Sequence, residues 1–185
     1  MKMKMRTAAA ATAIVLCTGI GALAQAFAPA VGEDGSITVP KDDYRKDWSY
    51  LGAFSVLGEE GAAELHVVYT QPASVEAYRQ TGRFPDGTVL VKELYEGTSD
   101  DLTTGRVSWS GEAAGWFVMV KDTQNRFPGN PLWGDGWGWA FFAAGEPDTP
   151  VTTDFKDECL ACHEPARDTD LVYVRGYPVL TGKGR

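Results

Sequence analysis

Short apolar runs, separated by Gly, Pro and Asp, make up most of the chain beyond its first 35 residues. Apolar and polar residues alternate within many of these runs, and Val, Tyr, Phe, Trp and Thr are frequent, which is typical of β-strands bounded by turns. The pattern predicts strands over residues 36–40, 48–57, 64–70, 88–96, 106–111, 115–122 and 137–145. Strands of this length joined by turns indicate a largely antiparallel sheet.

Two segments predict helices instead. Residues 72–82 begin with Pro72 and end with Gly82, the asymmetry expected at the two ends of a helix. Residues 152–166, TTDFKDECLACHEPA, indicate one short helix near the end of the chain, and residues 97–106 predict a surface turn. The expected fold is therefore mainly β, of the α+β type: an antiparallel sheet with one covering helix and a short C-terminal helix.

The beginning of the chain has the layout of a secretory signal. Three basic residues in the first six positions precede an apolar run over residues 8–24, and small residues suited to cleavage follow. We expect a signal peptide over residues 1–26 and one domain over residues 27–185, exported to the periplasm. An uncleaved anchor helix is the alternative, but a run of about 17 residues is short for a bilayer.

The chain is acidic, with a formal net charge of −8, and loss of the three basic residues of the signal would change this charge to −11. Such a surface repels nucleic acid and anionic membranes and favours basic partners. Of the three cysteines, Cys17 lies within the predicted signal, so Cys159 and Cys162 remain. Two cysteines do not make a disulfide scaffold.

These two cysteines belong to the motif C-x-x-C-H, which ends at His163 in the predicted C-terminal helix. In such a motif the thiols add across the vinyl groups of haem, and the adjacent histidine becomes the proximal ligand of the iron. Three alternatives are a Cys159–Cys162 disulfide, a zinc site and a thioredoxin-like redox pair. Zinc needs four ligands in a chain with few soft donors, and the redox pair needs a strand directly before it.

The position of the motif limits the kind of haem protein. Small electron-transfer cytochromes carry it near the N-terminus with a Met ligand downstream, whereas no Met or His follows His163. The helical-bundle cytochromes c′ have a late motif, but they need long helices with a period of 3.6 residues, which this sequence does not show.

Several longer segments are specific when taken together: YRKDWSYLG, TGRFPDGTVLVKELY, VKDTQNRF, WAFF, PDTP and ECLACHEPARDTDLVYVRGYPVL. Through them the chain, from about Pro40 to Leu180, resembles the cytochrome P-460 family, whose relatives include the cytochromes c′-beta. The resemblance implies an exported β-sheet protein with one haem c, usually a homodimer. It also implies hydroxylamine oxidation, as in cytochrome P-460 proper, or nitric oxide binding, as in the c′-beta branch.

The resemblance further implies that Lys92 bonds covalently to the porphyrin edge, because it occupies the lysine position of the segment DGTVLVKEL. Strand alternation places Leu90, Lys92 and Leu94 on one face. If that face is internal, burial lowers the pKa of the amine and favours its neutral form, which attacks carbon. From the residues alone, the alternative is a lysine whose stem covers apolar surface while its charge reaches solvent.

His66 lies in the strand-like segment ELHVVYT, at a position where the family often has Arg. It could lie above the iron as a hydrogen-bond donor or proton relay, since imidazole changes charge near neutral pH. Direct ligation of the iron and an ordinary hydrogen-bonded histidine are the alternatives. Met119 is expected in the core rather than on the iron.

The remaining candidate site residues have weaker signals. Phe117 and Phe54 are expected to wall the distal side of a haem pocket, because haem needs apolar cover. Arg175 and Tyr177, together with Asp170, follow the motif in the family-like tail. They could bond the haem propionates or hold the end of the chain.

Three functions are compatible with these residues. The leading hypothesis is an oxidoreductase that takes electrons from hydroxylamine at an open, five-coordinate iron. His66 or a carboxylate would be the base, and a soluble cytochrome or another acceptor would be the partner. The alternatives are a non-catalytic, c′-beta-like protein that binds nitric oxide, and simple electron transfer with a filled sixth position.

Overall fold

The computed structural model describes residues 30–182 of the chain. The predicted signal peptide, residues 1–26, lies outside this range, as does Cys17. Among the described residues, no helix is long and apolar enough to cross a membrane.

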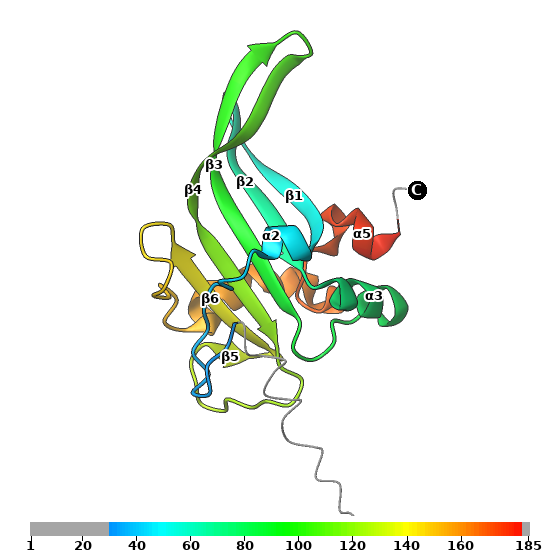
Figure 1. Ribbon diagram of the computed structural model, residues 1–185, viewed down its shortest axis with the longest axis vertical. Helices are drawn as coiled ribbons and strands as arrows, with labels where there is room; N and C mark the ends of the chain where they lie inside the picture. Colours follow the sequence, from blue (N-terminus) through cyan, green and yellow to red (C-terminus); the bar gives the residue numbers. More distant parts are fainter. Residues whose placement is uncertain (1–29, 183–185) are drawn as a thin grey trace, which may run out of the picture.

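In the described part of the chain, six antiparallel strands form one sheet in the order β1-β2-β3-β4-β6-β5 (Figure 1). The strands are β1 (Ser49–Gly58), β2 (Gly61–Thr70), β3 (Val89–Leu102), β4 (Gly105–Lys121), β5 (Trp133–Gly134) and β6 (Trp137–Ala143). Antiparallel neighbours need only tight connections, which the Gly-containing turns between β1 and β2 and between β3 and β4 provide. The predicted mainly β fold is confirmed.

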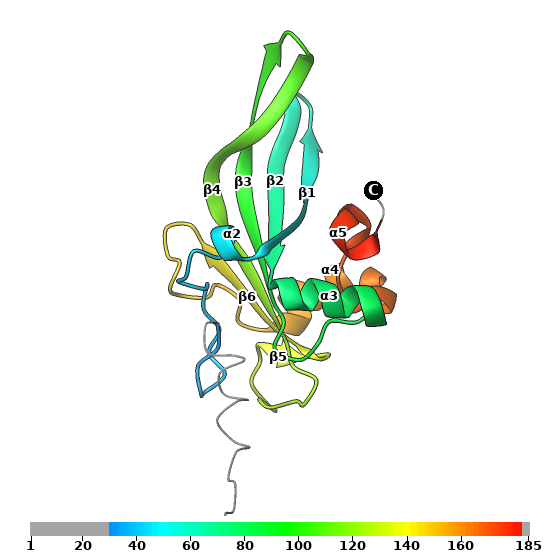
Figure 2. The same cartoon turned by 45° about the vertical axis from the view of Figure 1, so that its right-hand side comes forward.

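The longest strands, β3 and β4, form a hairpin that projects beyond the rest of the sheet (Figures 1 and 2). Their pairing continues to Leu102 and Gly105, so the surface turn predicted over residues 97–106 is present but contains only Thr103 and Thr104. The strands predicted over residues 106–111 and 115–122 are one strand. The β3 half of the projecting part, residues 97–102, is almost entirely polar, so it lacks the apolar alternation from which a strand is predicted.

The strand predicted over residues 36–40 is not formed. Ile37 makes an isolated bridge with Val31 and packs into the core against the sheet. Its apolar character therefore reflects burial on the face of the sheet rather than pairing within it. A short helix that the sequence pattern did not indicate, α2 (Tyr44–Asp47), follows and buries Tyr44.

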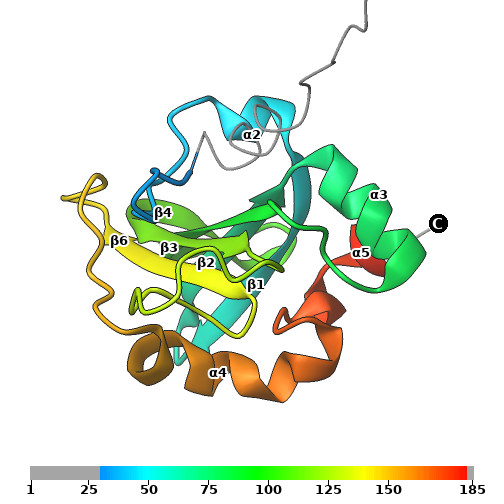
Figure 3. The same cartoon turned by 90° about the horizontal axis from the view of Figure 1, so that it is seen from below.

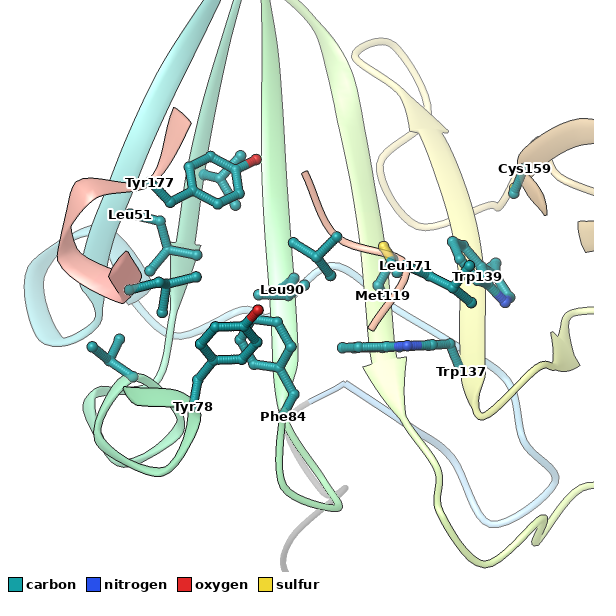
Figure 4. Packing of buried hydrophobic residues seen from close by; sticks show 14 of the residues in the cluster. Leu51, Tyr78, Phe84, Leu90, Met119, Trp137, Trp139, Cys159, Leu171 and Tyr177 are labelled. Atoms are coloured by element: carbon teal, nitrogen blue, oxygen red, sulfur yellow. The ribbon is translucent and has the colours of Figure 1, made fainter. Parts of the chain in front are cut away.

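Both faces of the sheet are covered (Figure 3). Strand alternation divides the side chains of β3: Val91 packs with the N-terminal residues and α2, whereas Leu90 packs with the C-terminal segment, residues 152–182. On this second side Leu90 lies beside Met119 of β4, and Leu171 and Tyr177 belong to the same core cluster (Figure 4).

The helix α3 (Pro72–Thr81) confirms the prediction over residues 72–82. Pro72 lies in its first turn, and Gly82 ends it in the left-handed conformation with a φ of 71°. Glycine adopts this conformation without steric cost. α3 lies beside α5 on the same side of the sheet as the C-terminal segment (Figure 3).

The C-terminal segment contains short helical turns rather than one regular helix. The helix predicted over residues 152–166 begins at Lys156 as a π turn and continues as a single α turn. Its start is set by Asp154, whose carboxylate accepts a hydrogen bond from the Lys156 amide. The elements are η1 (Lys156–Leu160), α4 (Ala161–His163), η2 (Glu164–Thr169), η3 (Val174–Gly176) and α5 (Pro178–Thr181).

A charged cluster ties the turn after α3 to the turn after β4. The Asp86 carboxylate accepts a hydrogen bond from the Thr123 amide at 2.8 Å and pairs with the guanidinium of Arg126, which also binds Asp122. Burial by itself would raise the pKa of Asp86, but the hydrogen bonds from Arg126 and Thr123 hold it below its ordinary value of 3.8. A carboxyl group of this kind contributes stability above its ordinary pKa and loses it as the pH falls.

We expect Asp86→Asn to lower the free energy of unfolding by about 2 kcal/mol at neutral pH, because the ion pair with Arg126 is lost. The difference from the wild type should shrink as the pH falls from about 4 through the lowered pKa of native Asp86, where the native carboxyl group becomes neutral as well. Urea unfolding at neutral pH and at a pH below about 4 measures the effect. Glu112→Gln removes an exposed carboxylate from β4 and serves as the control; an equal deficit of Asp86→Asn at both pH values would contradict the ionic role.

Candidate functional site

A cavity of about 420 Å³ lies between the sheet and the C-terminal segment. Strands β1, β2, β3, β4 and β6 form one wall, and η1, α4 and the residues after them form the other. Most of the lining is apolar. The side chains that bring chemistry to it are His66 and Lys92 on the sheet wall and Glu158, Cys159, Cys162 and His163 on the opposite wall.

The residues of the C-x-x-C-H motif converge on this cavity. Cys162 and His163 follow Cys159 by three and four positions, spacings that bring both side chains to the same face of a helix as Cys159, and all three line the cavity. Cys159 is buried and Cys162 is exposed, and both are free thiols in this structure. Burial raises the pKa of the Cys159 thiol to about 11, so this thiol is neutral at physiological pH.

The ring of His163 is oriented by one hydrogen bond and two aromatic neighbours. Its Nδ1 lies 2.6 Å from the carbonyl oxygen of Leu171, and because a carbonyl only accepts, Nδ1 carries the proton. Trp139 and Tyr173 flank the ring, with centroid distances of 4.9 and 6.1 Å. Burial lowers the pKa of His163 and so favours the neutral imidazole, whose Nε2 lone pair can bind a metal.

Within residues 30–182, no three side chains of His, Cys, Asp and Glu come together in a way that could hold a metal ion. Zinc requires such a set of protein ligands. Haem iron is held by the porphyrin, and the protein adds only axial ligands. The donors along the cavity, two thiols and one neutral imidazole, fit a covalently attached haem.

Lys92 lies in the sheet wall, between Val68 of β2 and Phe117 of β4 in the strand register. Its Nζ atom is 4.3 Å from the centre of the Phe117 ring. Burial lowers the pKa of Lys92, while nearby Cys162 and Glu64 act in the opposite direction. The amine therefore lies at the cavity, where burial makes its neutral form easier to reach than in solvent, rather than at the end of an extended surface side chain.

Glu93, the next residue of β3, anchors the strand from the opposite face. Its buried carboxylate accepts hydrogen bonds from the hydroxyl groups of Tyr44 and Tyr95, at 2.5 and 2.9 Å, and pairs with Arg45. Burial and the contact with Glu93 raise the pKa of both tyrosines, which keeps them protonated as donors. With Glu93 held on one face, strand alternation holds Lys92 on the other.

His66 lines the cavity from β2, where it pairs with Phe54 of β1 and Leu94 of β3. Its Nε2 lies 2.8 Å from a carboxylate oxygen of Glu64, two residues earlier on the same face. Only 18% of the His66 side chain is exposed, whereas Glu64 is about half exposed. The pair therefore connects the cavity wall to solvent.

Phe54 and Phe117, predicted to wall the pocket, both line it. Tyr177 also lines the cavity and packs edge-on against Phe54, with ring centres 5.4 Å apart; burial raises the pKa of its hydroxyl group. Arg175 is exposed and is not part of the lining, because η3 turns Tyr177 inward and leaves Arg175 at the surface. Met119 belongs to the core and also reaches the cavity.

Several residues of the cavity were not predicted from the sequence. Glu158, Tyr173 and Trp139 line it. Glu158 directly precedes the motif and Tyr173 lies in the family-like tail, so the sequence around each of them could have indicated its place in the site. No such indication exists for Trp139, because its position depends on the packing of β6 against the C-terminal segment. Asp170 does not line the cavity, since its buried carboxylate binds Lys121.

One comparison with known proteins identifies the family of the chain. The family model described as cytochrome P460 matches residues 41–174. The chain belongs to the cytochrome P460 family. The matched range contains the whole sheet, Lys92 and the C-x-x-C-H motif, and it ends before Tyr177. No curated protein matches the chain. Membership of the cytochrome P460 family implies a haem cofactor, in agreement with the cavity and its donors.

Proposed function

We propose that this member of the cytochrome P460 family is a periplasmic oxidoreductase that oxidises hydroxylamine at a five-coordinate haem c iron. The observation that carries the proposal is the chemistry of the cavity. One wall presents two thiols and an imidazole, and the other presents His66 with Glu64 behind it. The first set is suited to attach and ligate haem, and the second is suited to remove the protons that an amine releases on oxidation.

Four residues would hold the cofactor. Cys159 and Cys162 would form thioethers with the vinyl groups, and Nε2 of His163 would ligate the iron. Lys92 would bond to the porphyrin edge through its neutral amine. When bound, the haem supplies an open coordination position for the substrate and transfers the electrons to an external acceptor.

His66 would act as the base. An imidazole can accept a proton at one nitrogen while its other nitrogen donates to a partner, and here Nε2 has Glu64 as that partner. Because Glu64 is about half exposed, the proton can leave to solvent. Phe54 and Phe117 give the sheet wall apolar surface beside His66 and Lys92, and they would exclude water from the reacting amine.

A second candidate is a non-catalytic, c′-beta-like protein that binds nitric oxide. The aromatic side chains Phe54, Phe117 and Tyr177 favour it, because they give the cavity mainly apolar walls suited to a diatomic gas. Such a site needs no proton relay. The carboxylate behind His66 is the feature that favours the oxidoreductase. Simple electron transfer would instead require His66 or Met119 as a sixth ligand.

The proposed partners follow from the charge of the chain and from its family. The exported protein would be a homodimer with no contact to nucleic acid or membrane. It would pass electrons to a soluble cytochrome or another acceptor. A basic acceptor suits this acidic chain, because complementary charge speeds association.

The visible spectrum of the exported ferric protein tests the function. We expect hydroxylamine to change the spectrum and, when an artificial acceptor is present, to drive reduction of the acceptor. Binding of nitric oxide without turnover of hydroxylamine would support the second candidate instead. A low-spin spectrum that neither compound alters would support electron transfer.

His66→Leu is expected to lower kcat with hydroxylamine by about 100-fold, because a general base contributes a factor of this order. Glu64→Gln keeps a hydrogen-bonded oxygen beside His66 but takes up no proton, so it should lower kcat by a smaller factor. Glu96→Gln, opposite Glu64 in the register, removes a carboxylate outside the cavity and is the control. Full activity of His66→Leu would place the base elsewhere, first at Glu158, which also lines the cavity.

A further inference from the structure

The turn that follows η2 has an uncommon backbone. Leu171 N donates to Ala166 O at 2.9 Å and Asp170 N donates to Arg167 O at 3.2 Å, the pair of hydrogen bonds of a Schellman motif. Asp170 and Leu171 have φ values of 64° and 62°, in the left-handed region that glycine usually occupies. Each non-glycine residue there costs roughly 1 kcal/mol. Other contacts must therefore hold the turn.

The carboxylate and the backbone carbonyl of Asp170 supply these contacts. Its Oδ1 lies 2.6 Å from Nζ of Lys121 on β4, and the two side chains are only 9% and 10% exposed. Its Oδ2 accepts a hydrogen bond from Phe84 N at 2.9 Å. Trp137 Nε1 donates to the Asp170 carbonyl at 3.1 Å, and Lys121 Nζ lies over the Trp137 ring. The turn is thus fastened to β4, to β6 and to the residues after α3.

The same turn holds His163. The carbonyl of Leu171 accepts the hydrogen bond from His163 Nδ1 at 2.6 Å, and the left-handed conformation of the turn sets the direction of this carbonyl. The Leu171 side chain is buried in the core, so the carbonyl cannot rotate without disturbing packed residues. A hydrogen bond at Nδ1 orients an imidazole and makes its Nε2 a stronger donor to a metal.

We propose that Asp170 and Lys121 are positioning residues for the axial histidine. Their buried ion pair holds the Leu171 carbonyl against His163 Nδ1, and this contact sets how strongly Nε2 donates to the iron. The inference rests on the proposed ligation of haem iron by His163. Stronger donation from the axial ligand stabilises ferric iron, so loss of the ion pair between Asp170 and Lys121 shifts the reduction potential upward.

Asp170→Asn and Lys121→Met test the proposal in the exported, haem-loaded protein. Asn tolerates the left-handed conformation and keeps an oxygen for Phe84 N, but it loses the ion pair. Met keeps most of the apolar stem of Lys121 without the charge. In both variants the iron–histidine stretching band of the ferrous form should move to lower frequency, and the reduction potential should rise. The double variant should shift no further than the larger single effect, because both residues act through one contact.

Two controls separate positioning from general destabilisation. Arg83→Gln removes an exposed cation 3.9 Å from the same carboxylate. Val120→Ala opens a space beside Lys121 in the core on the other face of the sheet. Both should keep the wild-type band and potential, even if Val120→Ala lowers the melting temperature. An unmoved band and potential in folded Asp170→Asn and Lys121→Met would overturn the proposal.

If those two variants do not fold, Asp170→Gly decides the question. Glycine forms the left-handed turn without help from an ion pair, but it leaves the turn unanchored to β4. A shifted band would support the proposal and an unmoved band would overturn it. Absence of any iron–histidine band in the wild type would refute ligation by His163 and with it the proposed function. A normal band that no variant moves would refute the positioning role alone.

Discussion

In a Lys92→Leu background, which removes the proposed bond to the porphyrin edge, the double variant Cys159→Ser, Cys162→Ser is expected to lose covalently bound haem completely. Both thiols line one cavity and lie three residues apart on one helical face, so they can reach neighbouring vinyl groups of a single porphyrin. Serine keeps the size and polarity of each side chain but forms no thioether. Haem staining after denaturing electrophoresis, together with the mass of the peptide that contains the motif, measures the loss.

Each single variant should keep one thioether and should therefore stain, although at a lower yield. Ala161→Ser changes an exposed position between the two thiols and is the matched control, which should stain like the wild type. Wild-type staining of the double variant would refute attachment through the motif. A colourless wild-type protein after export would refute the haem site as a whole.

Lys92→Leu is expected to abolish the second attachment, the bond between β3 and the porphyrin edge. Digestion of the wild type should release one species in which a β3 peptide, haem and the motif peptide are joined, whereas the variant should release the β3 peptide separately. The Soret band should also shift, because a substituent on the ring alters its electron density. The fold should persist, since replacement of a buried charge by an apolar side chain is often neutral or stabilising.

Lys156→Leu is the control for this substitution. Lys156 is exposed at the start of η1, close in sequence to the motif but outside the cavity lining. The visible spectrum and the linked peptides of the Lys156→Leu variant should match those of the wild type. An unchanged Soret band in Lys92→Leu, with an unlinked β3 peptide in the wild type, would remove the cross-link from the proposal and leave the thioethers standing.

The order of elements explains why the attachment motif follows the sheet. All strands that wall the cavity are complete at Ala143, where β6 ends. The chain then crosses to the face of the sheet that walls the cavity, and it carries Cys159, Cys162 and His163 over that face. The chain returns to the sheet at Asp170, whose carboxylate pairs with Lys121 of β4. This contact closes the proximal side of the cavity. The sheet provides the rigid wall, and the C-terminal segment provides the groups that attach and ligate the cofactor.

Local signals in the sequence determined much of this protein. The C-x-x-C-H motif needs only adjacent residues, and the helix α3 is delimited by Pro72 and Gly82 at its own ends. Period-2 alternation placed Leu90 and Lys92 on one face, and the structure shows both at the cavity. These features are predictable because their energy comes from neighbours within a few positions along the chain.

Only the tertiary structure decided the rest. The alternation around Lys92 could not show that Glu93 would be buried on the opposite face, because its partner Tyr44 lies 49 residues away in a helix with no sequence pattern of its own. The ion pair between Lys121 and Asp170, also 49 residues apart, has the same origin. A buried charge is stable only when a partner from another element is packed against it. Such contacts exist only after the sheet and its two covering segments have come together.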